Sequence, residues 1–341
     1  MIDLSASLAL LASPAILFFF VGAAAAFARS DLTVPEPVSK ALSLYLMLCI
    51  GFKGGVEARA AGLDAGFLIA AAIGMSLSAA MPLLAFGLLR RFSSLDRPTV
   101  CALAATFGSV SVVTFAAGQQ HLATIGLASG GYMAAVLALM ETPAILTALL
   151  LMNGARPSPA LAYASAAAPD TTKQPPAARP GAVLREVFVG AATVMLLGSF
   201  LVGLVSGEAG MGRLELFVGP LFQGALCVFL LDIGLTAARR LMEGGKRLSP
   251  AVIGFAIGFP LLSAALALGL SRLAGLGAGD AALLTILAGS ASYIAVPAAM
   301  RIAAPQADPG VFVTASLAVA FPFNLTLGIG LYTAAVMWVW G

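Results

Sequence analysis

Charged residues are scarce in this chain. Only 10% of its 341 residues are Asp, Glu, Lys or Arg, whereas 60% are hydrophobic and the mean hydropathy is +1.02. A soluble globular domain carries roughly 25% charged residues to cover its surface. The shortage excludes a soluble domain, a disordered chain and a nucleic-acid-binding protein. It indicates an all-α polytopic membrane protein.

Histidine and cysteine are also rare. His121 is the one histidine, and the three cysteines lie in separate apolar runs without the C-x-x-C spacing of a metal or redox site. These counts exclude a His/Cys metal centre and a disulfide-rich secreted scaffold. We expect no cofactor and interpret Cys49, Cys101 and Cys227 as small apolar packing residues.

Apolar runs of about the length that crosses a bilayer recur ten times along the chain. A stretch rich in Ala and Pro divides them into two groups of five. We predict a first five-helix unit at 1–153, a flexible cytoplasmic linker at 154–182 and a second five-helix unit at 183–341. The expected helices are 8–27, 37–57, 65–89, 99–119, 125–153, 183–205, 217–238, 250–272, 279–301 and 310–338.

The basic residues are distributed unevenly between the loops. Fourteen of the eighteen Lys and Arg fall in alternate loops on one side of the expected membrane. Cytoplasmic loops carry such an excess, so this side is expected to face the cytoplasm. Both termini are then expected outside.

Short motifs recur in the two halves at nearly one offset. They pair 50–52 with 233–235, 108–111 with 289–292, and 143–147 with 322–326, at offsets of 183, 181 and 179. Each half holds an odd number of expected helices, so the second half enters the membrane in the opposite orientation. Inverted repeats of this kind are an architecture of secondary transporters.

Two of the repeated motifs, G-S-V-S and G-S-A-S, interrupt the expected helices four and nine. The N–H groups at such a break favour an anion, and the C=O groups favour a cation. The alternative is close helix packing by small residues. Glu141 lies deep in the fifth run, where a carboxylate is costly and is a functional candidate by default. The expected substrate-binding residues are Gly108, Ser109, Val110, Ser111, Gly289, Ser290, Ala291, Ser292 and Tyr293, and the expected Na⁺ ligands are Thr114, Glu141 and Thr142.

Several stretches together resemble the SbtA-like sodium-dependent bicarbonate transporter family. They are I-G-F-K-G-G-V-E-A-R at 50–59, F-G-S-V-S-V-V-T at 107–114, M-E-T-P-A-I-L-T at 140–147, G-P-L-F-Q-G-A-L at 219–226 and S-A-S-Y-I-A-V-P-A-A-M-R at 290–301. The resemblance implies a bacterial inner-membrane homotrimer with a gate domain (helices 1, 2, 6 and 7) and a core domain (helices 3–5 and 8–10). It also implies elevator-like movement of the core, and control by a PII-like cytoplasmic regulator.

The sequence departs from the family pattern at both breaks. Val112 and Val113 occupy positions at which the motif of the family that this chain resembles has Gly and Ser. Tyr293 occupies a position at which that motif has Asp. We expect a secondary transporter of a small anion, with sodium-dependent bicarbonate symport favoured, and no enzymatic activity. Na⁺ would be the coupling ion, with H⁺ coupling through Glu141 as its alternative. The other hypotheses are a carrier of a different small anion, a transport-inactive membrane sensor, and an intramembrane hydrolase built on Ser111 and His121.

Overall fold

The chain folds into helices. The computed structural model describes residues 12–62, 65–152 and 191–341, and these ranges contain no β-strand. Eight of their helices are long and apolar enough to cross a membrane, and two shorter apolar helices cover Pro14–Phe27 and Ala278–Ala288. The prediction of an all-α polytopic membrane protein is therefore confirmed at this level. The linker expected at 154–182 lies outside the described residues.

The helices follow the expected order along the chain. The first half contains α2 (Pro14–Phe27), α3 (Glu36–Ala61), α4 (Ala65–Phe92), α5 (Arg97–Gly108), α6 (Val112–Thr124) and α7 (Met133–Met152). The second half contains α10 (Ala191–Val218), α11 (Pro220–Gly244), the short 3-10 turn η2 (Gly245–Arg247), α12 (Pro250–Leu273), α13 (Ala278–Ala288), α14 (Ala295–Ala303), α15 (Pro309–Thr314), η3 (Ala315–Ala320), α16 (Phe321–Phe323), η4 (Asn324–Gly328) and α17 (Ile329–Trp340). The last five form one 32-residue helix in which η3 and η4 are π-helical.

Two expected boundaries are wrong. The helix predicted at 183–205 continues to Val218, through a kink at Gly207, whose φ of 58° only glycine adopts without strain. Residues 208–216 therefore form helix after the kink, where the sequence predicted a loop. The helix predicted at 125–153 begins at Met133, after a turn that contains Gly126 at a φ of 70°.

Local capping explains where several helices begin. The Asp96 carboxylate accepts a hydrogen bond from the Thr99 N–H at the start of α5, at 3.4 Å. Ser249 caps α12 in the same way, and each cap is followed by a proline in the first turn. A side-chain acceptor satisfies an N–H that has no partner within the helix, and proline there has no N–H to lose.

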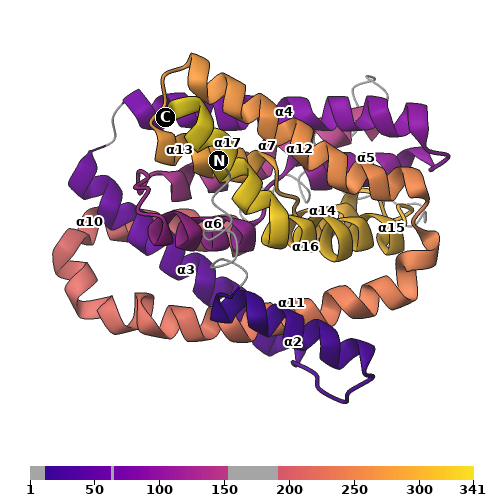
Figure 1. Ribbon diagram of the computed structural model, residues 1–341, viewed down its shortest axis with the longest axis horizontal. Helices are drawn as coiled ribbons and strands as arrows, with labels where there is room; N and C mark the ends of the chain where they lie inside the picture. Colours follow the sequence, from indigo (N-terminus) through magenta and orange to yellow (C-terminus); the bar gives the residue numbers. More distant parts are fainter. Residues whose placement is uncertain (1–11, 63–64, 153–190) are drawn as a thin grey trace, which may run out of the picture.

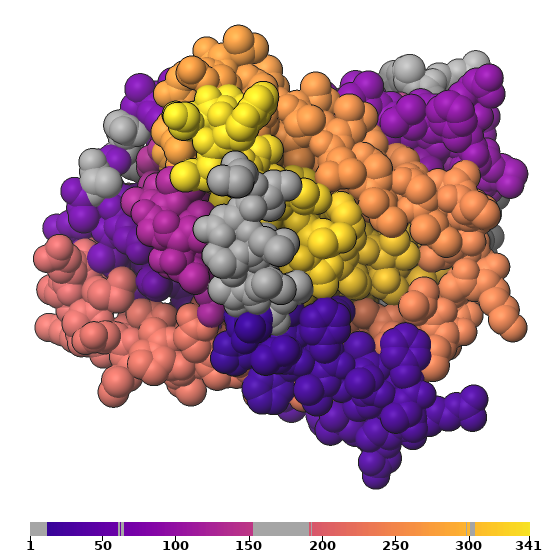
Figure 2. All heavy atoms as spheres, in the orientation of Figure 1, coloured from indigo at the N-terminus to yellow at the C-terminus, as the bar shows by residue number. Residues whose placement is uncertain are grey.

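Four helices form a layer along one side of the molecule. Helix α3 packs along α10, and α2 packs along α11. In Figures 1 and 2 this four-helix layer lies along the lower side, with the remaining helices above it. The backbones of α2 and α11 touch, because a Cβ on Gly22 would lie 2.0 Å from the Leu231 carbonyl oxygen, and a Cβ on Gly234 would lie 2.0 Å from that of Phe19.

The remaining helices form a larger block above this layer. Within it, α4 packs against α7 and α5, and α12 packs against α13 and η3. The outside of the molecule is apolar: Leu273, Trp338, Leu216 and Val205 are each more than three-quarters exposed. Lipid tails suit such a surface, whereas water does not.

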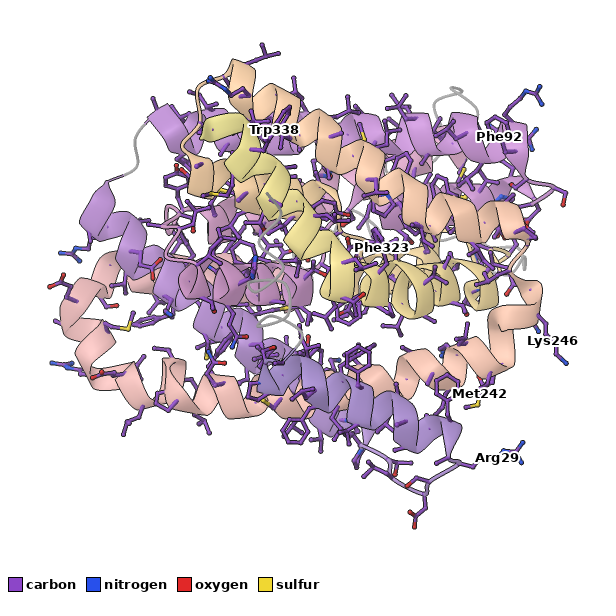
Figure 3. All side chains as sticks on the ribbon, in the orientation of Figure 1. Arg29, Phe92, Met242, Lys246, Phe323 and Trp338 are labelled. Atoms are coloured by element: carbon purple, nitrogen blue, oxygen red, sulfur yellow. The ribbon has the colours of Figure 1, made fainter. Side chains whose placement is uncertain are left out.

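Basic side chains gather at one end of the helices. Figure 3 places Arg29, Phe92 and Lys246 together at one end of the molecule and Trp338 toward the other. Arg90 and Arg91 directly precede Phe92 in the last turn of α4. The one ion pair among the described residues, Arg247 with Asp308 at 3.2 Å, adjoins Lys246. The arrangement agrees with loops that carry most of the basic residues on a single side.

Candidate substrate and ion site

Two helix breaks meet inside the larger block. The first lies between the end of α5 at Gly108 and the start of α6 at Val112, and the second lies between the end of α13 at Ala288 and the start of α14 at Ala295. The expected interruptions of helices four and nine are therefore present. Direct hydrogen bonds join the breaks: the Ser111 N–H donates to Ser290 Oγ at 2.9 Å, and the Ser292 N–H donates to the Thr106 carbonyl at 2.9 Å.

Serine hydroxyls replace the helical hydrogen bonds that are lost at the breaks. Ser111 Oγ accepts from the Thr114 N–H at 3.2 Å and so caps α6. Ser290 Oγ donates to the Leu287 carbonyl at 2.7 Å while it accepts from Ser111. A buried backbone group without a partner costs about 1–3 kcal/mol. The serines therefore let the chain leave and re-enter helical geometry in an apolar interior.

A small cavity lies where the breaks face the four-helix layer. Its volume is about 10 Å³, which is close to the room that one water molecule needs. The first residues of both α6 and α14 border it, so two helix N-termini begin at its wall. Its lining residues are Met47, Val110, Ser111, Val112, Glu141, Ser292, Tyr293, Ile294 and Ala295.

Glu141 supplies the one carboxylate among the described lining residues. Its side chain is only 5% exposed. No described residue forms an ion pair or a hydrogen bond with the carboxylate, although the Glu141 backbone carbonyl accepts from Ser109 Oγ at 3.5 Å. A buried carboxylate is expensive unless a proton or a cation neutralises it. The position therefore suits a group that binds a cation or carries a proton.

Tyr293 presents its ring to the rest of the block. The ring contacts Phe321 edge-on, with centroids 5.2 Å apart, and Phe321 in turn contacts Phe19 of α2 at 5.6 Å. The Tyr293 hydroxyl is buried and has no hydrogen bond of normal geometry to a described residue. The Ser111 side chain is its polar neighbour. The aromatic line connects the second break to the four-helix layer.

The cavity gathers some of the expected site residues and not others. Val110, Ser111, Ser292, Tyr293 and Glu141 line it. Seven expected residues do not: Gly108, Ser109, Thr114, Thr142, Gly289, Ser290 and Ala291.

Several of these seven support the breaks from outside the cavity. A Cβ on Gly108 would lie 2.4 Å from Pro82 Cγ, and a Cβ on Gly289 would lie 2.8 Å from the Tyr332 ring. Both glycines therefore allow close packing, which is the role that the alternative interpretation gave to small residues in these motifs. Ser290 holds the Ser111 N–H across the breaks.

Four lining residues were not predicted from the sequence: Met47, Val112, Ile294 and Ala295. The last three follow the motifs G-S-V-S and G-S-A-S within three residues, so extending each motif by three residues would have found them. Met47 belongs to α3 and reaches the cavity only through tertiary packing, and no sequence signal marks it. Ile294 is 37% exposed, so the cavity wall reaches the protein surface at this residue.

The pairing of Ser111 with His121 as nucleophile and base is wrong. Ser111 caps the N-terminus of α6, and His121 lies in its last turn. Ten residues of helix separate them by about 15 Å along the axis, whereas a base must lie within hydrogen-bond reach of its nucleophile.

A family model matches residues 14–337 of the chain, which is nearly its whole length, and its description is the Na⁺-dependent bicarbonate transporter superfamily. The chain belongs to this superfamily. No curated protein matches it. The site agrees with family membership in its chemistry. Carboxylate, hydroxyl and carbonyl oxygens suit a hard cation such as Na⁺, and within the described ranges no cluster of three His, Cys, Asp or Glu could hold a transition metal.

Proposed function

We propose that this member of the Na⁺-dependent bicarbonate transporter superfamily carries bicarbonate and Na⁺ together through the cavity between its helix breaks. One observation carries the proposal: the same small cavity is bordered by two helix N-termini and by a carboxylate that has no ion-pair or hydrogen-bond partner among the described residues. The N-termini of α6 and α14 offer N–H groups and positive dipole ends to an anion. The Ser111 and Ser292 hydroxyls add donors beside them.

Glu141 is the proposed side-chain ligand of Na⁺. Its carboxylate borders the cavity, and a bound cation there would both neutralise it and attract the anion. Cation and anion would then stabilise each other in a medium of low dielectric constant. This mutual stabilisation is a physical basis for coupled binding, which symport requires.

The proposed transport cycle moves the larger block relative to the four-helix layer. Among the described residues that line the cavity, Met47 comes from the layer and all the others belong to the block. A displacement of the block would carry the cavity past α3 and expose it to the other side of the membrane. The proposed inverted repeat is supported by the exchange of packing partners, since α2 and α10 hold corresponding places in the two halves and pair with α11 and α3.

The proposal includes the orientation that the basic residues predict, with the end that carries Arg29 and Lys246 in the cytoplasm of a bacterium. A homotrimer and a PII-like regulator complete it, and both rest on the family resemblance.

The decisive experiment is uptake of labelled bicarbonate into proteoliposomes, with and without an inward Na⁺ gradient. Uptake by the unaltered protein is expected only with Na⁺. In Glu141→Gln, the loss of a charged ligand should raise the Na⁺ concentration for half-maximal uptake by about 10- to 100-fold, equivalent to about 1.5–3 kcal/mol. Glu215→Gln, an exposed acid of α10, is the matched control and should leave uptake unchanged.

Three results would each contradict a different part of the proposal. Uptake driven by a proton gradient alone would transfer the coupling from Na⁺ to H⁺. Unchanged Na⁺ dependence in Glu141→Gln would remove this residue from the mechanism. Absence of uptake under either gradient, from a protein that stays folded, would refute bicarbonate as the substrate.

A further inference from the structure

A surface groove lies between α4 and α7, apart from the cavity between the helix breaks. Its volume is about 790 Å³, and its walls are Ala79, Ala80 and Leu83 of α4 and Leu150 and Leu151 of α7, among others. Ser76 also lines it. The small residues at 76, 79 and 80 share one face of α4, where neighbours lie three and four positions apart, so this face leaves a hollow.

The groove is lined by one basic side chain among the described residues. Arg97, in the first turn of α5, lines it and is exposed. Its guanidinium donates to the Leu151 carbonyl at 2.6 Å and lies 5.8 Å from the centre of the Phe86 ring. These contacts fix the position of the charge without neutralising it, since no acid in the described part of the chain forms an ion pair with Arg97.

Further basic residues lie near Arg97. Arg90 and Arg91 occupy the last turn of α4, and Arg90 and Arg97 both lie close enough to Cys101 to act on it electrostatically. The neighbouring acid is Asp96, whose carboxylate caps α5 through the Thr99 N–H. Arg97 is therefore the basic residue that lines the groove, and Arg90 and Arg91 precede it at the end of α4; of the nearby acids, Asp96 caps α5 and Asp308 pairs with Arg247.

The walls of the groove are helices that are expected to span the membrane. Its walls belong to Ala65–Phe92 and Met133–Met152, both of which are long and apolar enough to cross a bilayer. Hydrocarbon is the solvent for such a surface, and basic pockets between spanning helices on one side of a membrane bind lipid headgroups. An occupant must therefore present an apolar chain to the groove and an anion to its end.

We propose that this groove is a binding site for one anionic glycerophospholipid. An acyl chain lies along Ala79, Ala80 and Leu150, and the phosphate accepts hydrogen bonds from Arg97, with Arg90 and Arg91 adding positive potential. A free phosphate has no chain to fill the groove. A zwitterionic lipid fills it but gains less from the net positive charge.

The test counts lipids bound to the detergent-purified protein by native mass spectrometry. Phosphatidylglycerol should bind in a saturable 1:1 manner and at least fivefold more tightly than phosphatidylcholine of the same chains. Arg97→Gln should weaken phosphatidylglycerol binding about fivefold, which corresponds to ~1 kcal/mol for one basic residue near a membrane surface. Arg272→Gln is the matched control, because Arg272 also sits against an aromatic ring, that of Trp340.

A second variant keeps the proposal falsifiable if Arg97→Gln does not fold. Ala80→Leu fills the groove and leaves Arg97 in place, and it should also lose the preferred lipid. Glycerol 3-phosphate, which lacks acyl chains, should not displace phosphatidylglycerol. Equal binding of both lipids, unchanged binding in both variants, or association of two protein copies through this face on delipidation would each overturn the proposal.

Discussion

The contact between α2 and α11 makes a sharp prediction about stability. In Gly22→Ala the new Cβ would lie 2.0 Å from the Leu231 carbonyl oxygen and 3.0 Å from the Leu235 nitrogen. Real Cβ atoms do not approach closer than 3.0 Å, so α2 and α11 must separate by about 1 Å. The obstructing atom is a backbone oxygen inside a helix, and no change of rotamer can remove it.

The expected cost follows from this separation. Overpacking costs about 1–3 kcal/mol, and a gap of 0.5–1 Å forfeits roughly a quarter to a half of the dispersion energy of the atoms that face it. We expect about 2 kcal/mol and, for a chain of this length, a fall in the apparent melting temperature of roughly 2–4 °C. Because Gly234 makes the reciprocal contact with Phe19, the double variant Gly22→Ala/Gly234→Ala should cost less than the sum of the single variants.

The assay is thermal stability in detergent, followed by size-exclusion chromatography of heated samples. Gly224→Ala is the control in α11, because no atom lies within 4 Å of a Cβ at that position. This change should leave the apparent melting temperature unchanged or raise it, since alanine favours helix. Equal melting of Gly22→Ala and Gly224→Ala would refute the backbone contact.

Two further predictions concern buried hydrogen bonds. Ser290→Ala leaves the Ser111 N–H without its acceptor, so it should lower the free energy of unfolding by about 1–3 kcal/mol and reduce bicarbonate uptake. Ser290→Thr keeps the hydroxyl and should retain most of the stability and most of the uptake. Full uptake by Ser290→Ala would show that the breaks do not depend on this bond. Asp280 accepts from the Tyr132 hydroxyl at 2.5 Å and from the Gly130 N–H at 2.6 Å. Asp280→Asn should therefore lower the apparent melting temperature in the same assay by the equivalent of about 1.5–3 kcal/mol, and a temperature equal to that of the unaltered protein would contradict a charge-assisted contact.

The membrane class and both helix breaks could be predicted from the sequence because they depend on local composition. A run of apolar residues can only be buried in lipid or protein, and Gly and Ser are weak helix formers, so the motifs at 108–111 and 289–292 marked candidate breaks. The internal repeat also indicated that the two breaks belong together, and the bond from Ser111 to Ser290 joins them.

The lining of the cavity could not be predicted in full, because it depends on packing between distant segments. Met47 reaches it from α3, which no local pattern indicates. Gly289 and Gly108 were predicted to bind substrate, and their lack of a Cβ also admits Tyr332 and Pro82, which no local pattern indicates. A motif shows which backbone is irregular, whereas tertiary contacts decide which of its atoms face the ligand.

The small size of the cavity between the breaks also limits how the chain can pass ions. The cavity of about 10 Å³, with Met47 on one side and Ser111, Glu141 and Ser292 on the other, is too small to be a water-filled pore through the described part of the chain. On the proposed route through this cavity, each passage therefore requires a collective movement of the protein, which takes microseconds to milliseconds. The flux then has a ceiling on the order of 10³–10⁶ ions per second, and patch recordings should show no unitary conductance.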